Sequence, residues 1–187
     1  MSTSATDTAG GVTTWTIDPA HSTVEFSVKH LMISSVKGRF GDVKGMVRLD
    51  EATPARSHVQ IEIGIASVDT RAEQRDAHLR SADFFDAERF PTMTYTSKRI
   101  EGDARGKFKI IGDLTIRDVT REVPLEGEFE GRNRDPWGGE RMAFVATGKV
   151  NRKEFGLNWN QALETGGWLV GDDIKLSIEV QLVLQKS

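Results

Sequence analysis

Strict alternation of apolar and polar residues constrains the fold of this chain more than any other feature. In "STVEFSVKHLMI", Val24, Phe26 and Val28 alternate with polar residues, and "SHVQIEIGIASV" has the same period. Near the C-terminus, "DIKLSIEVQLVLQ" places six apolar residues on one face, namely Ile174, Leu176, Ile178, Val180, Leu182 and Leu184. A period of two is typical of antiparallel strands with one apolar and one solvated face.

The pattern predicts nine strands, at residues 13–17, 22–32, 36–49, 57–67, 91–101, 106–117, 119–131, 140–150 and 173–185. Several are longer than the common strand length of about 5–6 residues. The strands do not alternate regularly with helical patterns of 10–15 residues, so parallel βαβ units are not expected. About eight long antiparallel strands can close into a barrel, whose interior is either filled or holds one small ligand. We therefore predict an all-β fold built on an extended antiparallel barrel, in which any cavity would be a tunnel.

One segment has a helical pattern. Residues 70–73, "TRAE", match a capping box and predict a helix at about 71–81, with room for a further turn to Phe85. Leu79 is its only large aliphatic residue, so we expect a surface helix anchored by Phe84 and Phe85. Its charged residues would then form pairs such as Asp76–Arg80 on a solvated face.

Length and composition limit the other possibilities. A chain of 187 residues suits one domain, predicted at 13–187, after a small, polar and disordered tail at 1–12. The net charge of −3 without a run of Lys or Arg argues against a nucleic-acid partner. The chain has no cysteine, no apolar stretch long enough for a transmembrane segment and no recognisable signal peptide. A soluble cytoplasmic protein is the resulting expectation.

The polar residues offer few candidates for chemistry. The four histidines form no compact metal-binding motif, so no metal site is expected. Asp18, His21 and Ser22 supply the side-chain types of a hydrolytic triad, but no G-x-S-x-G motif surrounds Ser22. A turn in which Asp18 caps backbone N–H groups is favoured over a triad.

Three motifs occur in order along the chain: D-x-x-H-S in "IDPAHSTVEFSV", R-D-x-H-L-x-S-x-x-F-F in "RDAHLRSADFF", and G-D-L-T-I in "GDLTIRDV". Together with "ATGKVNRKEFGLNW" and "VGDDIKLSIEVQL", they resemble the YceI-like family of polyisoprenoid-binding proteins over about residues 15–182. The resemblance implies a lipocalin-like barrel whose apolar interior holds a long-chain isoprenoid, a quinone or a similar lipid. It implies no catalytic residue and no cofactor other than that lipid.

Two departures from the family pattern stand out. Family members often carry a periplasmic signal peptide, which is not recognised here. The family also commonly has glycine in the hairpin where this chain has Asp118.

From the resemblance and the strand pattern together, we hypothesise that apolar residues line the tunnel. The candidates are Val24, Phe26, Val28, Phe40, Ile61, Ile63, Met93, Phe108, Ile110, Phe144 and Trp159, with Phe84 and Phe85 closing or lining it. The polar motif residues Asp18, His21, Arg75, Asp76 and His78 would tie the first turn and the helix to a barrel end.

Two alternatives to a lipid carrier or sequestering protein stay open. The first is a hydrolase or isoprenoid-modifying enzyme that uses His21 with Asp18, or Asp76 with His78. The second is a scaffold whose barrel interior is filled and whose outer face binds another protein. Homodimer formation is compatible with all three.

Overall fold

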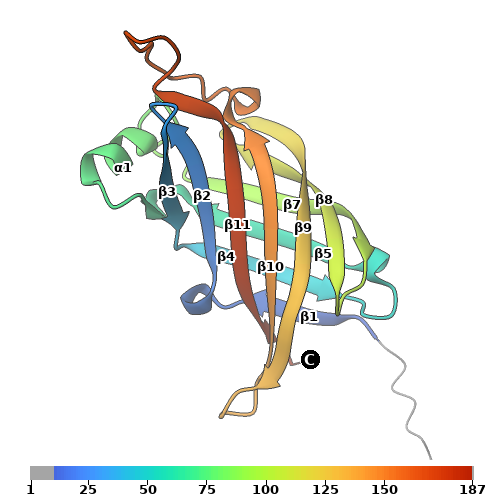
Figure 1. The fold of residues 1–187 in the computed structure, drawn as a ribbon. Coiled ribbons are helices and arrows are strands. Elements are labelled where there is room, and N and C mark those ends of the chain that lie inside the picture. Colours follow the sequence, from blue (N-terminus) through green and yellow to red (C-terminus); the bar gives the residue numbers. More distant parts are fainter. Residues whose placement is uncertain (1–10, 187) are drawn as a thin grey trace, which may run out of the picture.

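A computed structural model describes residues 11–186 of the chain (Figure 1). Residues 1–10 of the predicted disordered tail lie outside this range. Within it the chain forms one α-helix, α1 (Glu73–Arg80), four short 3-10 turns and eleven strands. The strands are β1 (Thr13–Ile17), β2 (Thr23–His30), β3 (Ser34–Phe40), β4 (Val43–Leu49), β5 (His58–Gly64), β6 (Val68–Asp69), β7 (Thr92–Gly102), β8 (Lys107–Ile116), β9 (Val119–Arg134), β10 (Glu140–Asn151) and β11 (Val170–Leu184).

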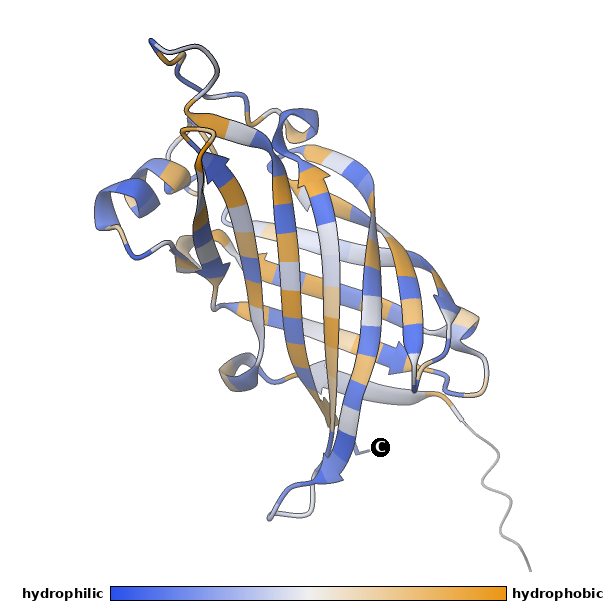
Figure 2. Ribbon diagram, viewed as in Figure 1, coloured by the Kyte–Doolittle hydropathy of each residue, from blue (hydrophilic) through white to orange (hydrophobic). Residues whose placement is uncertain are grey.

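Eight of the strands close into an antiparallel barrel. They are hydrogen-bonded in the order β1-β4-β5-β7-β8-β9-β10-β11, and the ring closes where Trp15 of β1 pairs with Leu184 of β11. The all-β barrel of about eight long strands is therefore confirmed. Apolar and polar residues alternate along its strands, as the colours in Figure 2 show, and the apolar residues form the buried core.

Strand β11 is shared between the ring and a smaller extension. Residues 182–184 pair with β1, whereas residues 174–179 pair with β2, which continues to β3 and β6. The ring is thus closed by β1 at one end only. At the other end β2, β3 and the segments around α1 form the wall (Figure 1).

The predicted strand 36–49 is in fact two strands, β3 and β4. The chain bends at Gly41–Asp42 because β3 pairs with β2 and β6, while β4 pairs with β1 and β5. Strict alternation cannot reveal such a bend, since both halves keep an apolar face.

Helix α1 falls within the predicted range, but its start differs. The position before the helix is Ala72, which makes no side-chain cap hydrogen bond, so the predicted capping box does not form. Asp76 instead accepts hydrogen bonds from the Thr70 N–H at 2.9 Å and the Thr70 hydroxyl at 2.5 Å. After Arg80 the chain continues as turns rather than as helix.

Candidate apolar ligand chambers

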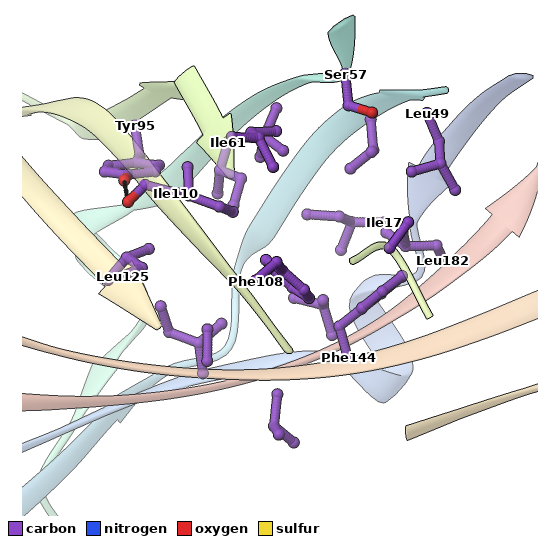
Figure 3. A pocket seen from close by; sticks show the side chains of 18 of the residues that line it. Ile17, Leu49, Ser57, Ile61, Tyr95, Phe108, Ile110, Leu125, Phe144 and Leu182 are labelled. Carbon is purple, nitrogen blue, oxygen red and sulfur yellow. Dashed lines mark hydrogen bonds between the residues drawn. The ribbon is translucent and has the colours of Figure 1, made fainter. Parts of the chain in front are cut away.

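The barrel interior contains two apolar cavities. The first, here called the β1-side chamber, has a volume of about 100 Å³. Its lining comes from all eight ring strands and two turns, and includes Ile17, Val47, Leu49, Ser57, Val59, Ile61, Tyr95, Ile100, Phe108, Ile110, Leu125, Phe144, Ala146, Ile178, Val180 and Leu182. Figure 3 shows Phe108 and Phe144 from different strands side by side in this chamber, with ring centroids 5.6 Å apart.

The second cavity, here called the α1-side chamber, has a volume of about 130 Å³. It is lined by Phe26, Val28, Phe40, Leu79, Phe84, Phe85, Met93, Leu114, Ile116, Val150, Arg152, Leu157, Val170, Ile174 and Leu176. Strand β11 lines both chambers through its single apolar face. The period-two pattern of the sequence therefore builds one continuous apolar wall.

Tyr95 lies where the two chambers meet. On β8, Gly112 falls between Ile110 of the β1-side chamber and Leu114 of the α1-side chamber. A β-carbon at Gly112 would lie 2.6 Å from Cζ of the Tyr95 ring, so the ring packs directly on this glycine. The nearby apolar residues Val24 and Val43 are buried but line neither chamber.

The polar side chains of the lining turn their polar atoms into the barrel wall. The Tyr95 hydroxyl donates to the Val123 carbonyl at 2.8 Å, with the Ile110 carbonyl at 3.5 Å (Figure 3). Burial raises the pKa of this hydroxyl, and the charges of Asp113 and Glu122 raise it further, so it stays neutral. The Ser57 hydroxyl accepts from the Asp50 N–H at 2.9 Å. Apolar surface is what remains to contact a ligand.

Among the described residues, Arg152 is the one charged residue that lines either chamber, and it is almost fully buried, at 5% exposure. Its guanidinium donates to the carbonyls of Leu157, Trp159 and Gly171 at 2.7–2.8 Å. Burial lowers its pKa, which Asp172 at 3.7 Å partly counteracts. The side chain therefore holds the segment 156–169, here called the strap, against the end of the barrel.

Aromatic rings cover the outer end of the α1-side chamber. The Phe85 ring packs against Phe40, with ring centroids 5.7 Å apart. The ring centroid of Trp159, in the strap, lies 4.6 Å from that of His78 and 5.4 Å from that of Phe84. Except for Phe40 of β3, these rings come from a turn, a helix and the strap rather than from paired strands. Side-chain packing, not strand pairing, closes this end.

The predicted tunnel residues divide between the two chambers. Six line the α1-side chamber, namely Phe26, Val28, Phe40, Phe84, Phe85 and Met93. Four line the β1-side chamber, namely Ile61, Phe108, Ile110 and Phe144. Val24 and Ile63 are buried but line neither chamber, and Trp159 lies outside the lining against His78 and Phe84.

Several lining residues were not among the predicted ones. Tyr95, Leu114, Leu125 and the apolar face of β11 could have been found by extending the same alternation along their strands. Arg152 gave no such signal, because its position depends on carbonyls of the strap, which has no periodic pattern.

The first candidate catalytic pair, Asp18 and His21, is part of a structural turn. His21 Nδ1 lies 2.8 Å from Asp18, and Asp18 also accepts from the Ala20 N–H, as predicted for a cap. The Ser22 hydroxyl is buried and accepts from the Gln181 N–H instead, so these residues are not arranged as a triad.

Arg141 connects this turn to the β9–β10 hairpin. It donates to Asp18 at 2.6 Å and to Asp135 at 3.0 Å. Burial raises the pKa of Asp18, but the hydrogen bonds from Arg141, His21 and the Ala20 N–H outweigh this effect and hold that pKa below its ordinary value. The Gly139 N–H and Arg141 likewise lower the pKa of Asp135.

The second candidate pair is separated. Asp76 is bound to Thr70, while His78 Nε2 lies 2.8 Å from Asp83. The expected Asp76–Arg80 pair on a solvated face is also wrong, because Asp76 is buried and Arg80 donates to the carbonyls of Ala66 and Val68. Arg80 thus ties α1 to the segment before it, whereas Asp76 and His78 make their hydrogen bonds within residues 70–83.

Among the residues described, no group of three or more His, Cys, Asp or Glu side chains is arranged to hold a metal ion. Residues 11–186 also contain no helix with the length and apolar character needed to cross a membrane.

Known proteins resemble this chain in both sequence and structure. It is 36% identical to a UPF0312 protein of Staphylococcus aureus strain USA300 over 176 residues, which cover 94% of this chain and all of that one. The crystal structure of the Campylobacter jejuni YCEI protein matches with a TM-score of 0.70 at 37% identity, covering 85% of this chain and 90% of that chain.

A polyisoprenoid-binding domain from Saccharophagus degradans aligns with a TM-score of 0.68 over 94% of this chain and all of that chain. At 13% identity, this likeness concerns the fold alone. The sequence model of the YceI-like domain matches residues 15–182, nearly the whole described chain. The chain therefore belongs to the YceI-like family.

Proposed function

We propose that this protein binds a long-chain apolar lipid inside its barrel: a polyisoprenoid, an isoprenoid quinone or a similar amphiphile. The observation that carries the proposal is the apolar lining of both chambers. Its few polar side chains form hydrogen bonds with the backbone of the surrounding wall. The polyisoprenoid-binding description of the Saccharophagus degradans domain agrees with it.

The sizes of the chambers favour a chain-like ligand. Each is smaller than the ~300 Å³ at the lower end of typical small-molecule pockets, with volumes of about 100 and 130 Å³. Strand β11 lines both from Ile174 to Leu182, a length of roughly 27 Å at about 3.4 Å per residue. A long lipid would therefore lie along the barrel axis and displace side chains where the chambers meet, at Tyr95.

The ligand contacts that we propose are the residues predicted from the sequence: the ten that line the two chambers, together with Val24, Ile63 and Trp159, which a longer ligand would reach. The β11 face and Tyr95 join them, since they line the same surface. Burial of each CH₂ contributes about 0.8 kcal/mol, so a long chain gains affinity without polar contacts. Ordering the flexible chain offsets part of that gain.

Carriage, storage or sequestration fits this interior better than catalysis. General acid–base catalysis needs a titratable group within hydrogen-bond reach of the reacting atom. Neither Asp18 nor His21, and neither Asp76 nor His78, lines a chamber.

Organic extraction of the purified protein, followed by mass spectrometry, tests the proposal. We expect an extractable long-chain lipid in a stable ratio to protein. Absence of such a lipid, together with no uptake of added polyprenol or quinone, would contradict it.

A matched pair of variants localises the ligand. Ala146 lines the β1-side chamber, whereas its neighbour Thr147 is exposed on the outer face of β10. Ala146→Phe should fill the chamber and reduce bound lipid, while Thr147→Phe should leave the amount unchanged. Equal lipid content in both variants would place the ligand outside this chamber.

A further inference from the structure

The β2–β3 turn presents large apolar side chains to solvent. Leu31 and Met32 form its two central positions, and the Ile33 N–H donates to the His30 carbonyl at 3.2 Å to close it. Met32 is 65% exposed and Ile33 is 82% exposed. Figure 2 shows this turn as an apolar segment at one extremity of the molecule.

The backbone of this turn does not suit its residues. Leu31 and Met32 both have positive φ, at 54° and 61°. Hairpin turns with two positive φ values are normally formed by Asn-Gly or similar pairs, because a β-carbon is strained there. Neither burial nor turn geometry therefore explains why Met32 and Ile33 are large and apolar.

The strap adds a tryptophan next to the turn. The Leu31 N–H donates to the Leu169 carbonyl at 2.9 Å, and the Met32 thioether lies directly against Gly167. Trp168 is 56% exposed. Leu31, Met32, Ile33 and Trp168, here called the apolar tip, thus form one cluster from two segments that are far apart in the sequence.

The apolar tip is continuous with the wall of the α1-side chamber. Val28 and Val170 line that chamber, and His30, which precedes the tip, pairs with Val170. The other highly exposed tryptophan, Trp137 at 86%, belongs to the β9–β10 turn at the opposite extremity (Figure 1). Its neighbours Asp135, Pro136, Gly138 and Gly139 include no large apolar residue, so it offers a natural control.

We propose that the apolar tip inserts into the surface layer of a lipid bilayer and docks the α1-side end of the barrel against the membrane. A protruding cluster that includes a tryptophan suits the boundary between head groups and acyl chains. A second copy of the chain is a poorer occupant, because a stable interface uses about 20–30 residues a side and the tip has four.

The charges near the tip indicate which lipid surface it requires. Lys153 is paired with Asp172, the strap carries Glu164, and Lys29 lies near the end of β2. With no excess of positive charge, docking depends on apolar insertion rather than on attraction to anionic lipids. The inference draws on the proposed function only for its purpose, which is exchange of the lipid ligand with a membrane.

Co-sedimentation of the full chain with phosphatidylcholine vesicles tests the proposal. We expect partitioning that falls at least tenfold in Met32→Ser/Ile33→Ser and stays unchanged in Trp137→Ser. Adding phosphatidylglycerol to the vesicles should have little effect. No partitioning of the wild-type protein, or an equal loss in the Trp137 control, would overturn the inference.

A second variant separates membrane docking from folding. Leu31→Asn/Met32→Gly supplies residues that suit the turn, so it should raise the thermal midpoint while lowering the vesicle-bound fraction. If the midpoint falls instead, the apolar side chains serve the fold and the inference fails. A concentration-dependent dimer abolished by Met32→Ser/Ile33→Ser would also overturn it, in favour of a contact between copies.

The two proposals fail in distinguishable ways. Lipid extracted from Met32→Ser/Ile33→Ser should match that from the wild type once loading is complete, whereas loading from vesicles should be slower. Vesicle binding without any extractable lipid would refute the proposed ligand and leave the docking surface intact. Extractable lipid without vesicle binding would refute the docking surface and leave the proposed ligand intact.

Discussion

The two ends of the barrel are closed in different ways. At the β1 side, backbone hydrogen bonds between β1 and β11 complete the ring, and Trp15 is fully buried there. At the α1 side, the wall depends on α1, a turn that carries Phe84 and Phe85, and the strap held by Arg152. Arg117 donates from Nη1 to the Phe84 carbonyl of this turn. Its buried Nε has no hydrogen-bond partner among the described residues.

This difference separates a fixed end from a movable one. Opening the β1 side requires breaking strand pairs, which act cooperatively with the rest of the sheet. The α1 side can open by moving side chains and short irregular segments, which are the parts of a protein with low local stability. We therefore expect a lipid to enter and leave at the α1 side, and the following predictions test that expectation.

The largest effect is expected from Phe84→Ala/Phe85→Ala. Phe84 is only 7% exposed, and replacing a buried phenylalanine by alanine costs about 3–5 kcal/mol. Loss of both rings also uncovers the α1-side chamber, so bound lipid should be released at least about tenfold faster in an exchange assay with acceptor vesicles.

The matched control for this pair is Arg80→Gln/Asp83→Asn, which changes polar contacts of the same segment. Its lipid retention should stay near that of the wild type. Because the alanine variant risks unfolding, Phe84→Leu/Phe85→Leu provides a folded intermediate. Slow lipid release from the leucine variant, with fast release from the polar control, would contradict the role of Phe84 and Phe85 in covering the chamber.

Arg152→Met should destabilise the strap. It removes hydrogen bonds to the carbonyls of Leu157, Trp159 and Gly171, and hydrogen bonds from a charged group contribute about 1.5–3 kcal/mol each, although not additively. We expect a loss of about 3 kcal/mol in the free energy of unfolding and faster amide exchange in residues 156–171. Faster exchange in β1 and β4 alone would contradict the distinction between the two ends.

Tyr95→Phe should have a smaller effect, at the junction of the chambers. The variant leaves the buried Val123 carbonyl without its hydroxyl donor, which costs about 1 kcal/mol. Because the ring still packs on Gly112, lipid content should not change. Urea unfolding and lipid extraction measure the two effects, and a large loss of lipid would indicate that the hydroxyl binds the ligand.

The smallest effect, and one far from the chambers, is expected from Arg141→Gln. The lowered pKa values of Asp18 and Asp135 contribute stability above the ordinary carboxyl pKa of about 4, and this contribution is lost as the pH falls through the lowered values. The free energy of unfolding of the wild type should therefore exceed that of the variant most near neutral pH, and this difference should narrow below about pH 4. Urea unfolding midpoints of both proteins across this pH range measure the difference. A difference that widens at low pH would contradict the prediction.

The strand pattern predicted the barrel because one buried face imposes a period of two, and that period is visible residue by residue in β2, β5 and β11. The same pattern identified residues such as Phe26 and Phe108 as chamber lining. It could not show that the interior holds two chambers or that the Tyr95 ring packs on Gly112, because both depend on contacts between neighbouring strands.

The irregular segments were harder to predict. Thr70 matches a capping box, yet it binds Asp76 and Arg75, because the tertiary contact with the helix replaces the local one. The role of Arg152 depends on carbonyls brought together only by the fold. Sequence reasoning therefore reached the paired strands at both ends of the barrel, but not the irregular contacts that close the movable end.

The most direct test of a lipid-binding interior is the dependence of affinity on chain length. Isoprenoid alcohols of increasing length can be titrated into delipidated protein by calorimetry. Binding free energy should improve with each added unit, by up to about 0.8 kcal/mol per CH₂ buried, and level off when both chambers are filled. Affinity that does not depend on chain length, or no binding at any length, would contradict the account.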